Sequence, residues 1–298
     1  MARFRSHGKL LLTGEYLVLH GATALAVPCK LGQTLDFQPS AGQTVRWNSL
    51  DENGQSWFEV HFDIRTLKLF ETNEVEIWEK LSQILQKAKN LNPEFLSVGG
   101  SVTTQLEFDR SWGLGSSSTL ISNIALWAQI NPYELLNQTF GGSGYDVACA
   151  QANTPILYTR NHFQPKIKSV PFNPSFKESL FFVYLNQKKN SQEAIASFEP
   201  NLIRSSTITE MNKLTQSFLE CNEQENFNRL LNSHEALLGA VLNQKPVQEK
   251  LFEDFSGAIK SLGAWGGDFI LASGNHESPA YFKRKGYPIV IPFEKMII

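Results

Sequence analysis

The feature that most constrains this chain is a glycine- and serine-rich run at residues 112–118, Trp-Gly-Leu-Gly-Ser-Ser-Ser. It follows a strand-like segment, residues 102–108, and precedes an apolar segment that we expect to be helical over about 119–130. Glycines let the backbone approach a bulky anion, and the N–H groups that begin a helix favour negative charge. The serine hydroxyls can bind phosphate or magnesium. The run therefore predicts a phosphate-binding loop, and the simpler alternative is a serine N-cap after a flexible turn.

Two better-known nucleotide motifs do not fit this run. A Walker loop needs Gly-Lys followed by Ser or Thr, and the sequence contains no such triplet. The dinucleotide-binding fingerprint needs a third glycine where Ser118 stands, and no regular alternation of strands and helices follows. The loop therefore belongs to another class of phosphate site.

A second glycine-rich segment, residues 141–146, places the carboxylate of Asp146 at a tight turn. An enzyme that transfers a phosphoryl group needs a side chain that orients and deprotonates the acceptor hydroxyl, and an aspartate can do both. The alternative is that Asp146 caps a helical segment over residues 147–152.

Lys9 stands at the start of an apolar strand, a few residues before Gly14-Glu15-Tyr16. A lysine there is costly to bury unless it is paired, so it could pair with Asp146 and with the transferred phosphate. The alternative is an exposed lysine at a strand end. Near the C-terminus, residues 260–268 place several glycines between an expected helix and a strand, and a helix C-cap turn is the simpler interpretation.

Taken in order, these segments resemble the motifs of the GHMP kinases, which include galactokinase, homoserine kinase, mevalonate kinase and phosphomevalonate kinase. Residues 9–21 look like the first motif, residues 113–118 like the phosphate loop and residues 263–268 like the third motif. The resemblance spans nearly the whole chain. Gly-Glu-Tyr and Ser-Gly-Tyr-Asp-Val-Ala point to the mevalonate and phosphomevalonate kinase branch, in particular the subgroup with a Gly-Tyr-Asp-Ile-Ala signature, here residues 144–148.

The resemblance implies an α+β fold with two domains. The first would be like domain 2 of ribosomal protein S5 and the second ferredoxin-like, with the active site between them. A cluster of prolines, at positions 165, 171 and 174, lies in a segment with no strong periodicity of apolar residues. We therefore expect the domains to cover residues 1–165 and 166–298.

The resemblance also implies a role for each matching residue, with ATP and Mg²⁺ as cofactors. Lys9 and Asp146 would be the catalytic pair, and Ser117, with Glu134, would bind Mg²⁺. The implied contacts to the ATP phosphates are Gly113, Leu114, Gly115, Ser116, Ser117 and Ser118, and those to the substrate are Glu15, Tyr16, Gly266 and Gly267. Residues 187–193, including Lys188, Lys189 and Ser191, resemble a substrate-phosphate loop of phosphomevalonate kinases.

Three positions depart from the pattern of these kinases. His7 stands where they usually have proline. Trp265 replaces a small residue in the third motif, so either the site is narrower or Trp265 points away from it. The glutamate that binds magnesium in the family has no clear match, because Leu135 falls near its spacing and Glu134 is one residue off.

The resemblance predicts a kinase that transfers the γ-phosphoryl group of ATP to a hydroxyl or phosphate of a small metabolite, with mevalonate or phosphomevalonate as family-level candidates. One alternative is the related ATP-dependent diphosphomevalonate decarboxylase, which Gly8-Lys9 disfavours. Another is a catalytically silent member of the family that binds a ligand. The retention of Lys9 and Asp146 disfavours it.

Composition sets the remaining expectations. The formal net charge of −2 argues against broad capture of nucleic acid or of an anionic membrane. Three cysteines, widely spaced, favour reduced thiols in a cytoplasmic protein. No apolar stretch approaches the length of a membrane span, and the N-terminus does not look like a signal peptide. We expect a small-molecule substrate, no nucleic-acid or membrane partner, and leave the oligomeric state open.

The remaining elements follow from apolar spacing and turn signals. Asn53-Gly54 predicts a hairpin between two strands. Helices are expected over residues 74–89, 133–140, 206–221, 227–242, 247–262 and 278–285. Strands are expected over residues 9–12, 16–19, 23–27, 33–38, 102–108, 180–185, 269–272 and 289–292.

Overall fold

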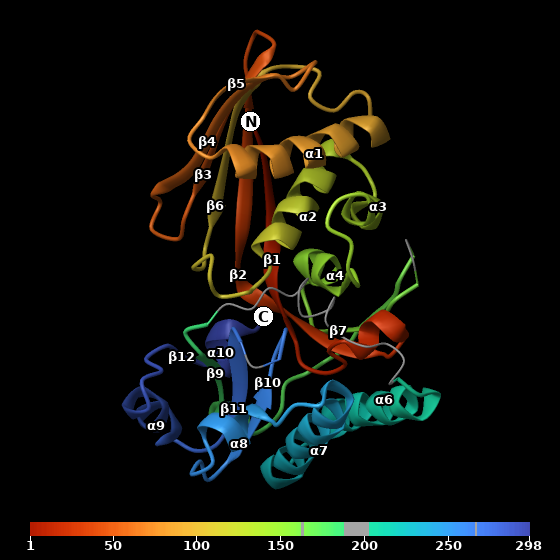
Figure 1. Cartoon of the computed structure of the whole chain (residues 1–298), viewed down its shortest axis with the longest axis vertical. Coiled ribbons are helices and arrows are strands. Elements are labelled where there is room, and N and C mark those ends of the chain that lie inside the picture. Colours follow the sequence, from red (N-terminus) through yellow and green to blue (C-terminus); the bar gives the residue numbers. More distant parts are fainter. Residues whose placement is uncertain (162–163, 188–202, 266) are drawn as a thin grey trace. The chain divides into compact units, whose positions relative to one another are not determined.

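The computed structural model describes residues 1–161, 164–187, 203–265 and 267–298. These residues form an α+β fold with two sheets, which confirms the predicted fold class (Figure 1). They divide into two compact units that interleave along the chain. The first consists of Met1–Gly8, Leu31–Arg110 and Leu114–Gln151, and the second of Lys9–Lys30, Ser111–Gly113 and Ala152–Ile298. The domain boundary between residues 165 and 166 stays a prediction.

The sheet of the first unit runs in the order β5-β4-β3-β6-β2, and β1 also pairs with β2. β3 and β4 form the hairpin that Asn53-Gly54 predicted, and β3 pairs in parallel with β6. The strands are β1 (Ala2–Leu11), β2 (Ala24–Pro39), β3 (Thr44–Leu50), β4 (Ser56–Asp63), β5 (Leu69–Thr72) and β6 (Gly100–Leu106). β1 and β2 also contribute residues to the second unit.

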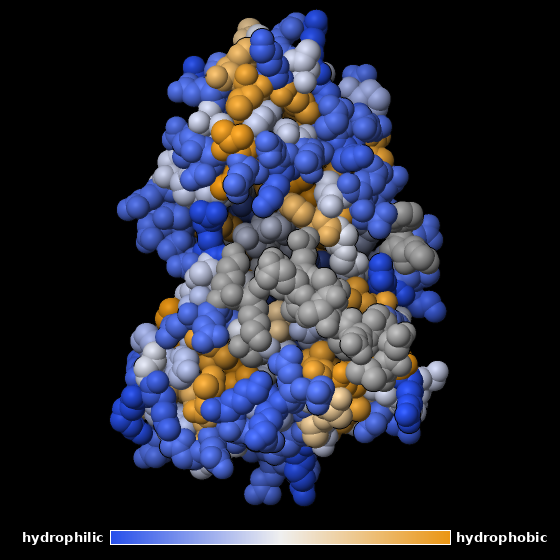
Figure 2. Space-filling view, viewed as in Figure 1, coloured by the Kyte–Doolittle hydropathy of each residue, from blue (hydrophilic) through white to orange (hydrophobic). Residues whose placement is uncertain are grey.

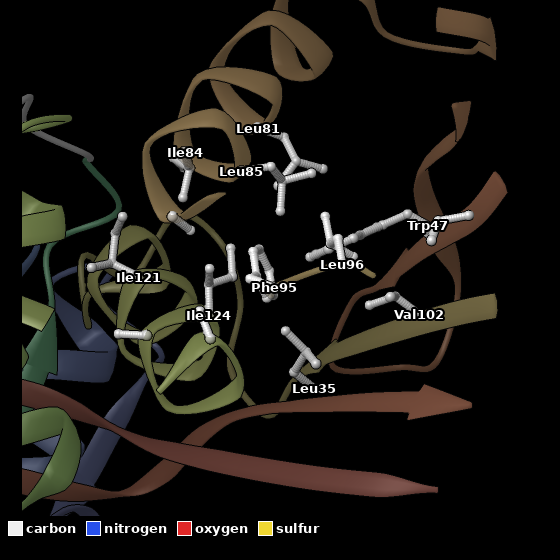
Figure 3. Packing of buried hydrophobic residues seen from close by; sticks show 14 of the residues in the cluster. Leu35, Trp47, Leu81, Ile84, Leu85, Phe95, Leu96, Val102, Ile121 and Ile124 are labelled. Atoms are coloured by element: carbon white, nitrogen blue, oxygen red, sulfur yellow. The ribbon is translucent and has the colours of Figure 1, made fainter. Parts of the chain in front are cut away.

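Helices α1 and α2 cover one face of this sheet, as Figure 1 shows. The helices of the first unit are α1 (Val75–Leu91), α2 (Ser116–Ala128), α3 (Pro132–Asn137) and α4 (Tyr145–Gln151). In α1, Leu81, Ile84, Leu85 and Ala88 recur three and four positions apart, so one stripe of the helix is buried. This stripe meets Ile121 of α2 and the side chains of the sheet, of which Leu35, Trp47 and Val102 are labelled in Figure 3.

The second unit is built on an antiparallel sheet in the order β10-β11-β9-β12, and a further pair of strands, β7 and β8, extends from β2. Its strands are β7 (Ile156–Thr159), β8 (Lys166–Ser169), β9 (Leu180–Tyr184), β10 (Ala258–Ser261), β11 (Phe269–Ser273) and β12 (Val290–Pro292). Its helices are η1 (Leu17–His20), η2 (Lys177–Ser179), α6 (Ser205–Glu220), α7 (Gln224–Leu242), α8 (Val247–Leu251), α9 (Ser278–Arg284) and α10 (Phe293–Met296). α7 packs on β10 and beside α6.

Most predicted elements are present within a few residues, but three predictions are wrong. The separate strands expected over residues 23–27 and 33–38 are one continuous strand, β2. The helix expected over residues 247–262 ends at Leu251, and its second half is strand β10. Apolar residues keep a helical spacing there, yet Gly257 lies so close to β11 that a Cβ would meet the Ser273 carbonyl oxygen at 2.0 Å. The strand expected over residues 16–19 is instead a short 3₁₀ helix, because Tyr16 and Gly21 both adopt positive φ.

The surface carries mainly polar side chains in the view of Figure 2, with scattered apolar patches. Phe70 and Val75 are among the exposed large apolar residues. Among the described helices, none is both long and apolar enough to cross a membrane.

Replacing Leu85 with Ala should remove a fully buried side chain from the contact between α1 and the sheet of the first unit. Large-to-small changes in a core cost about 2–5 kcal/mol, so we expect the free energy of unfolding, measured with urea, to fall by that amount. Gln83→Ala, on the exposed side of the same helix, should change it by less than about 0.5 kcal/mol. Equal effects of the two changes would contradict the packing of α1.

Candidate active site

The glycine-rich loop leads directly into α2, which begins at Ser116, three residues earlier than predicted. Gly113 and Gly115 have φ of 65° and 93°, in the left-handed region that glycine adopts without strain. Gly115 is the N-cap and has no side chain that could accept a hydrogen bond from the first turn. The N–H groups of this turn are therefore not satisfied by a side-chain cap, which suits an anion.

The hydroxyl groups of this first turn differ in their surroundings. Ser118 is buried and donates to the Gly115 carbonyl oxygen at 2.9 Å, and Thr119 donates to Gln33 Oε1 at 2.8 Å. Ser117 is exposed and Ser116 is partly exposed. The side chains of Ser116 and Ser117 are thus the accessible hydroxyls, whereas Ser118 can offer its backbone N–H.

Lys9 lies beside the first glycine of the loop. Its ammonium group donates to the Gly113 carbonyl oxygen at 2.9 Å, and both residues belong to the second unit. The structure thus brings together two segments that are 104 positions apart in the sequence. The Gly113 carbonyl oxygen is thus a hydrogen-bond partner for the half-buried ammonium group, which would be costly to bury without one.

The Asp268 carboxylate also lies against Gly113. A Cβ at position 113 would lie 2.2 Å from Asp268 Oδ2, so a larger residue there would require the Asp268 side chain to move. Asp268 ends the segment that resembles the third motif, and its preceding neighbour Gly267 is buried. The third motif and the start of the glycine-rich loop are therefore in contact within the second unit.

Aromatic packing fixes the residues that precede Gly113. Trp112 packs against Phe269 and Tyr184, with ring centroids 5.5 and 6.3 Å apart. The Tyr184 hydroxyl donates to Ser111 Oγ at 3.0 Å. Sequence reasoning missed this support, and the only signal for it was the aromatic character of Trp112 beside the glycines.

Asp146 lies in the first turn of α4, where its Oδ1 accepts the backbone N–H of Val147 at 3.0 Å. This contact is local to the start of α4 and does not decide between the capping and the catalytic interpretations of Asp146. It leaves the catalytic role untested, because Asp146 belongs to the first unit and Lys9 to the second. The pairing of Lys9 with Asp146 stays a prediction.

Glu15 and Tyr16 are both buried in the second unit. The Glu15 carboxylate pairs with the Lys260 ammonium, and both side chains are at most 1% exposed. Burial disfavours the ionised carboxyl, but Lys260 and the contact with His234 together outweigh it, and the pKa of Glu15 is lowered. The Tyr16 hydroxyl donates to the Ala264 carbonyl oxygen at 3.2 Å, and burial, with the nearby Glu15 charge, raises its pKa to about 12.

His234 completes this buried cluster. Its Nε2 lies 3.2 Å from Glu15 Oε2 and accepts the backbone N–H of Gly14 at 3.3 Å. Burial and the Lys260 charge lower the pKa of His234 to about 4, so the ring is neutral at pH 7 and Lys260 is the cation that pairs with Glu15. The predicted contacts of Glu15 and Tyr16 with a substrate stay predictions.

No protein-family model matches this sequence, and no curated protein sequence matches it. Solved structures do. Mevalonate kinase of Methanococcus jannaschii superposes with a TM-score of 0.68 at 17% identity, over 95% of this chain and 94% of that one. Phosphomevalonate kinase of Streptococcus pneumoniae, in complex with phosphomevalonate and AMPPNP, gives 0.68 at 17% identity over 96% of both chains. Galactokinase of Lactococcus lactis, in complex with galactose, gives a TM-score of 0.66 at 15% identity, over 99% of this chain and 93% of that one.

The chain has the GHMP kinase fold. Within this fold, the Trp265 indole is buried in the second unit, in a cluster with Tyr16, Leu17 and Leu238. Gly266 and the segment around Lys188, Lys189 and Ser191 lie outside the described residues.

Glu134 lies in the first turn of α3, whose N-cap Asn131 accepts the Tyr133 N–H at 2.9 Å. The neighbouring Leu135 is fully buried, so Glu134, which is partly exposed, is the more suitable of the two positions for a ligand. In the described part of the chain no three His, Cys, Asp or Glu side chains cluster as a metal site. A magnesium ion bound mainly by nucleotide phosphates and water needs no such cluster. Its binding by Ser117 and Glu134 stays a prediction.

Lys260→Met should leave the Glu15 carboxylate buried without its cation. Removal of one partner of a buried ion pair costs about 3–5 kcal/mol, and we expect the free energy of unfolding at pH 7 to fall by about that amount. In the wild type the pKa of Glu15 is below its usual 4.5, so the stabilisation is present above this value and is lost as the pH falls through the lowered pKa. In the variant, burial dominates and the pKa rises, so the carboxyl is neutralised as the pH falls.

The loss caused by Lys260→Met should therefore be smaller at about pH 5 than at pH 7 in urea unfolding. The matched control is Lys245→Met, an exposed lysine in the same unit, which should change the stability by less than about 0.5 kcal/mol. A loss of the same size at both pH values would show that Glu15 is not the group left unpaired.

Proposed function

We propose that this protein is an ATP-dependent small-molecule kinase. The observation that carries the proposal is the contact of the Lys9 ammonium with the Gly113 carbonyl, where a left-handed glycine loop leads into a helix without a side-chain cap. Backbone N–H groups at such a helix start bind phosphate, and a lysine beside them adds positive charge. The GHMP kinase fold supports the same activity, because solved structures of this fold include mevalonate kinase and galactokinase.

The residues present suit a nucleotide triphosphate. Gly115 lacks the Cβ atom that would keep phosphate oxygens away from the backbone, whereas at Gly113 the corresponding space is filled by the Asp268 carboxylate. Ser116 and Ser117 have accessible hydroxyl groups at the start of α2, and Leu114 and Ser118 contribute backbone only, because their side chains are buried. We propose that this segment binds the phosphates, and that Ser117 and Glu134 bind the accompanying Mg²⁺, which would neutralise phosphate charge.

In the proposed reaction the acceptor oxygen forms a bond to the γ-phosphorus, and the bond to the bridging oxygen of ADP breaks. Asp146 would orient the acceptor hydroxyl and take its proton, and Lys9 would stabilise the charge on the transferred group. Glu15, Tyr16, Gly266 and Gly267 are proposed to shape the acceptor site. For the buried Glu15, this role would be exerted through Lys260 and the backbone around Gly14.

Mevalonate and phosphomevalonate are the proposed substrate class, because kinases for both have this fold. The test is an ATP-consumption screen over small hydroxy acids, sugars and their phosphates. Phosphorylation of one member supports the kinase. Release of carbon dioxide with ATP consumption would favour a decarboxylase, and nucleotide binding without turnover would favour a silent binder. A cytoplasmic location stays a prediction.

Asp146→Asn should keep the shape of the side chain and remove the base. General-base catalysis is worth about 10²–10⁴-fold in rate, so turnover of the substrate found in the screen should fall by about that factor. ATP affinity should change little, because the glycine-rich loop is unaltered. Lys9→Met should lower turnover and also weaken nucleotide binding.

Asp254→Asn is a suitable control, because this exposed carboxylate pairs with Lys285 on the surface. It should retain wild-type turnover. If Asp146→Asn turned over substrate at the wild-type rate, the mechanism would be wrong even if the protein is a kinase.

A further inference from the structure

Trp265 has an unusual backbone conformation for a large residue. Its φ is 52°, in the left-handed region that glycine normally occupies, and the conformation costs free energy that other contacts must offset. The indole is 1% exposed and belongs to the buried cluster of Tyr16, Leu17, Met211 and Leu238. Burial of this large ring is the offsetting contact.

Helix α7 is shaped to receive the indole. A Cβ at Gly239 would lie 3.3 Å from Trp265 Cη2 and 2.9 Å from the Gln244 carbonyl oxygen, so a larger residue would crowd both. One turn earlier, Glu235 Oε1 accepts the indole N–H of Trp265 at 3.1 Å. The same helix thus provides both the space for the ring and the acceptor for its only polar atom.

The Glu235 carboxylate accepts two hydrogen bonds, one from Trp265 and one from Ser261. Its second oxygen, Oε2, accepts the Ser261 hydroxyl at 2.8 Å, at the end of β10. Ser261 and Trp265 flank the beginning of the segment that resembles the third motif, and Glu235 is itself 2% exposed. One buried carboxylate therefore holds residues on both sides of Gly263.

This loop also contacts the glycine-rich loop. Asp268, three residues after Trp265, has its carboxylate against Gly113, whose carbonyl accepts the Lys9 ammonium. Asp268 thus follows Trp265 closely in the sequence and contacts Gly113, which is the route by which Glu235 would act on the glycine-rich loop. All of these residues belong to the second unit.

We propose that Glu235 is a positioning residue for the candidate active site, which fixes the segment over residues 261–265 through Ser261 and Trp265 and holds it more tightly when its carboxyl is ionised. Hydrogen bonds to an ionised acceptor are stronger than those to a neutral acid, which supplies the direction of the effect. The consequence for nucleotide binding rests on the proposed function, whereas the contact with Trp265 does not.

The surroundings of Glu235 place the ionisation of its carboxyl near neutral pH. Burial raises the pKa of Glu235 to about 7, with Glu15 adding to the rise, while Lys260 and the Ser261 hydrogen bonds oppose it. His234, with a pKa of about 4, stays neutral over the same range. On the other side, Glu235 lines a groove of about 680 Å³ whose charged residues are Lys245, Glu249 and Glu253.

The first test is the ¹⁵N–¹H resonance of the Trp265 indole, identified as the indole signal that Trp265→Phe removes. Between about pH 5.5 and 8.5 it should shift with a midpoint near 7, because the acceptor of its N–H gains a charge. Glu235→Gln should abolish the titration. The control Glu249→Gln, an exposed carboxylate in the same groove, should leave it unchanged. A resonance that does not titrate, or that titrates equally in Glu235→Gln, would overturn the proposal.

The second test is calorimetric binding of magnesium AMPPNP as a function of pH. Between pH 8 and pH 6 the wild type and Glu249→Gln should lose about 5-fold more affinity than Glu235→Gln, the lower end of typical coupling between sites. Identical pH profiles in all three proteins would mean that Glu235 is only structural, and would overturn the positioning role. Absence of nucleotide binding by the wild type would contradict the kinase proposal instead, and the indole titration distinguishes the two failures.

Discussion

The buried pair of Glu15 and Lys260 is the interaction on which the second unit of this protein depends. Removing two charges from water costs several kcal/mol for each ion, and only a close partner and further hydrogen bonds recover it. The partners come from opposite ends of the sequence, 245 positions apart, and both side chains are essentially inaccessible. Chain arrangements that separate them would leave a buried charge unpaired. The segment around Gly14 and the end of β10 are therefore held in one arrangement.

From this arrangement follow the contacts of the candidate site. Lys260 also donates to the Ser261 carbonyl oxygen at 2.7 Å, and the Ser261 hydroxyl donates to Glu235, which accepts Trp265. The loop that continues from Trp265 brings Asp268 against Gly113. A chain of buried polar contacts thus extends from Glu15 of the first motif to Trp265 of the third. Buried polar contacts of this kind specify one arrangement of the segments that they join.

Much of the fold could be predicted from local patterns. The stripe of α1 and the Asn-Gly hairpin both appear where periodicity and turn chemistry placed them. The prediction failed where a neighbouring strand decided the conformation, as at β10, since a short apolar run fits either a helix or a strand. The glycine-rich loop was located from its residues alone. Its neighbours Tyr184 and Asp268 were not, because nothing in their local sequence says which distant backbone they will contact.

The sequence by itself determined the positions of the glycines, of Lys9 and of the apolar stripes, because backbone freedom, charge and hydrophobic spacing are properties of residues and their near neighbours. Only the tertiary structure decided that Trp265 turns into the core, that Glu15 is enclosed by Lys260 and His234, and that Lys9 meets the carbonyl of Gly113. Each of these is a contact between segments distant in sequence. Its free energy depends on desolvation and on a partner that appears only when the chain has folded.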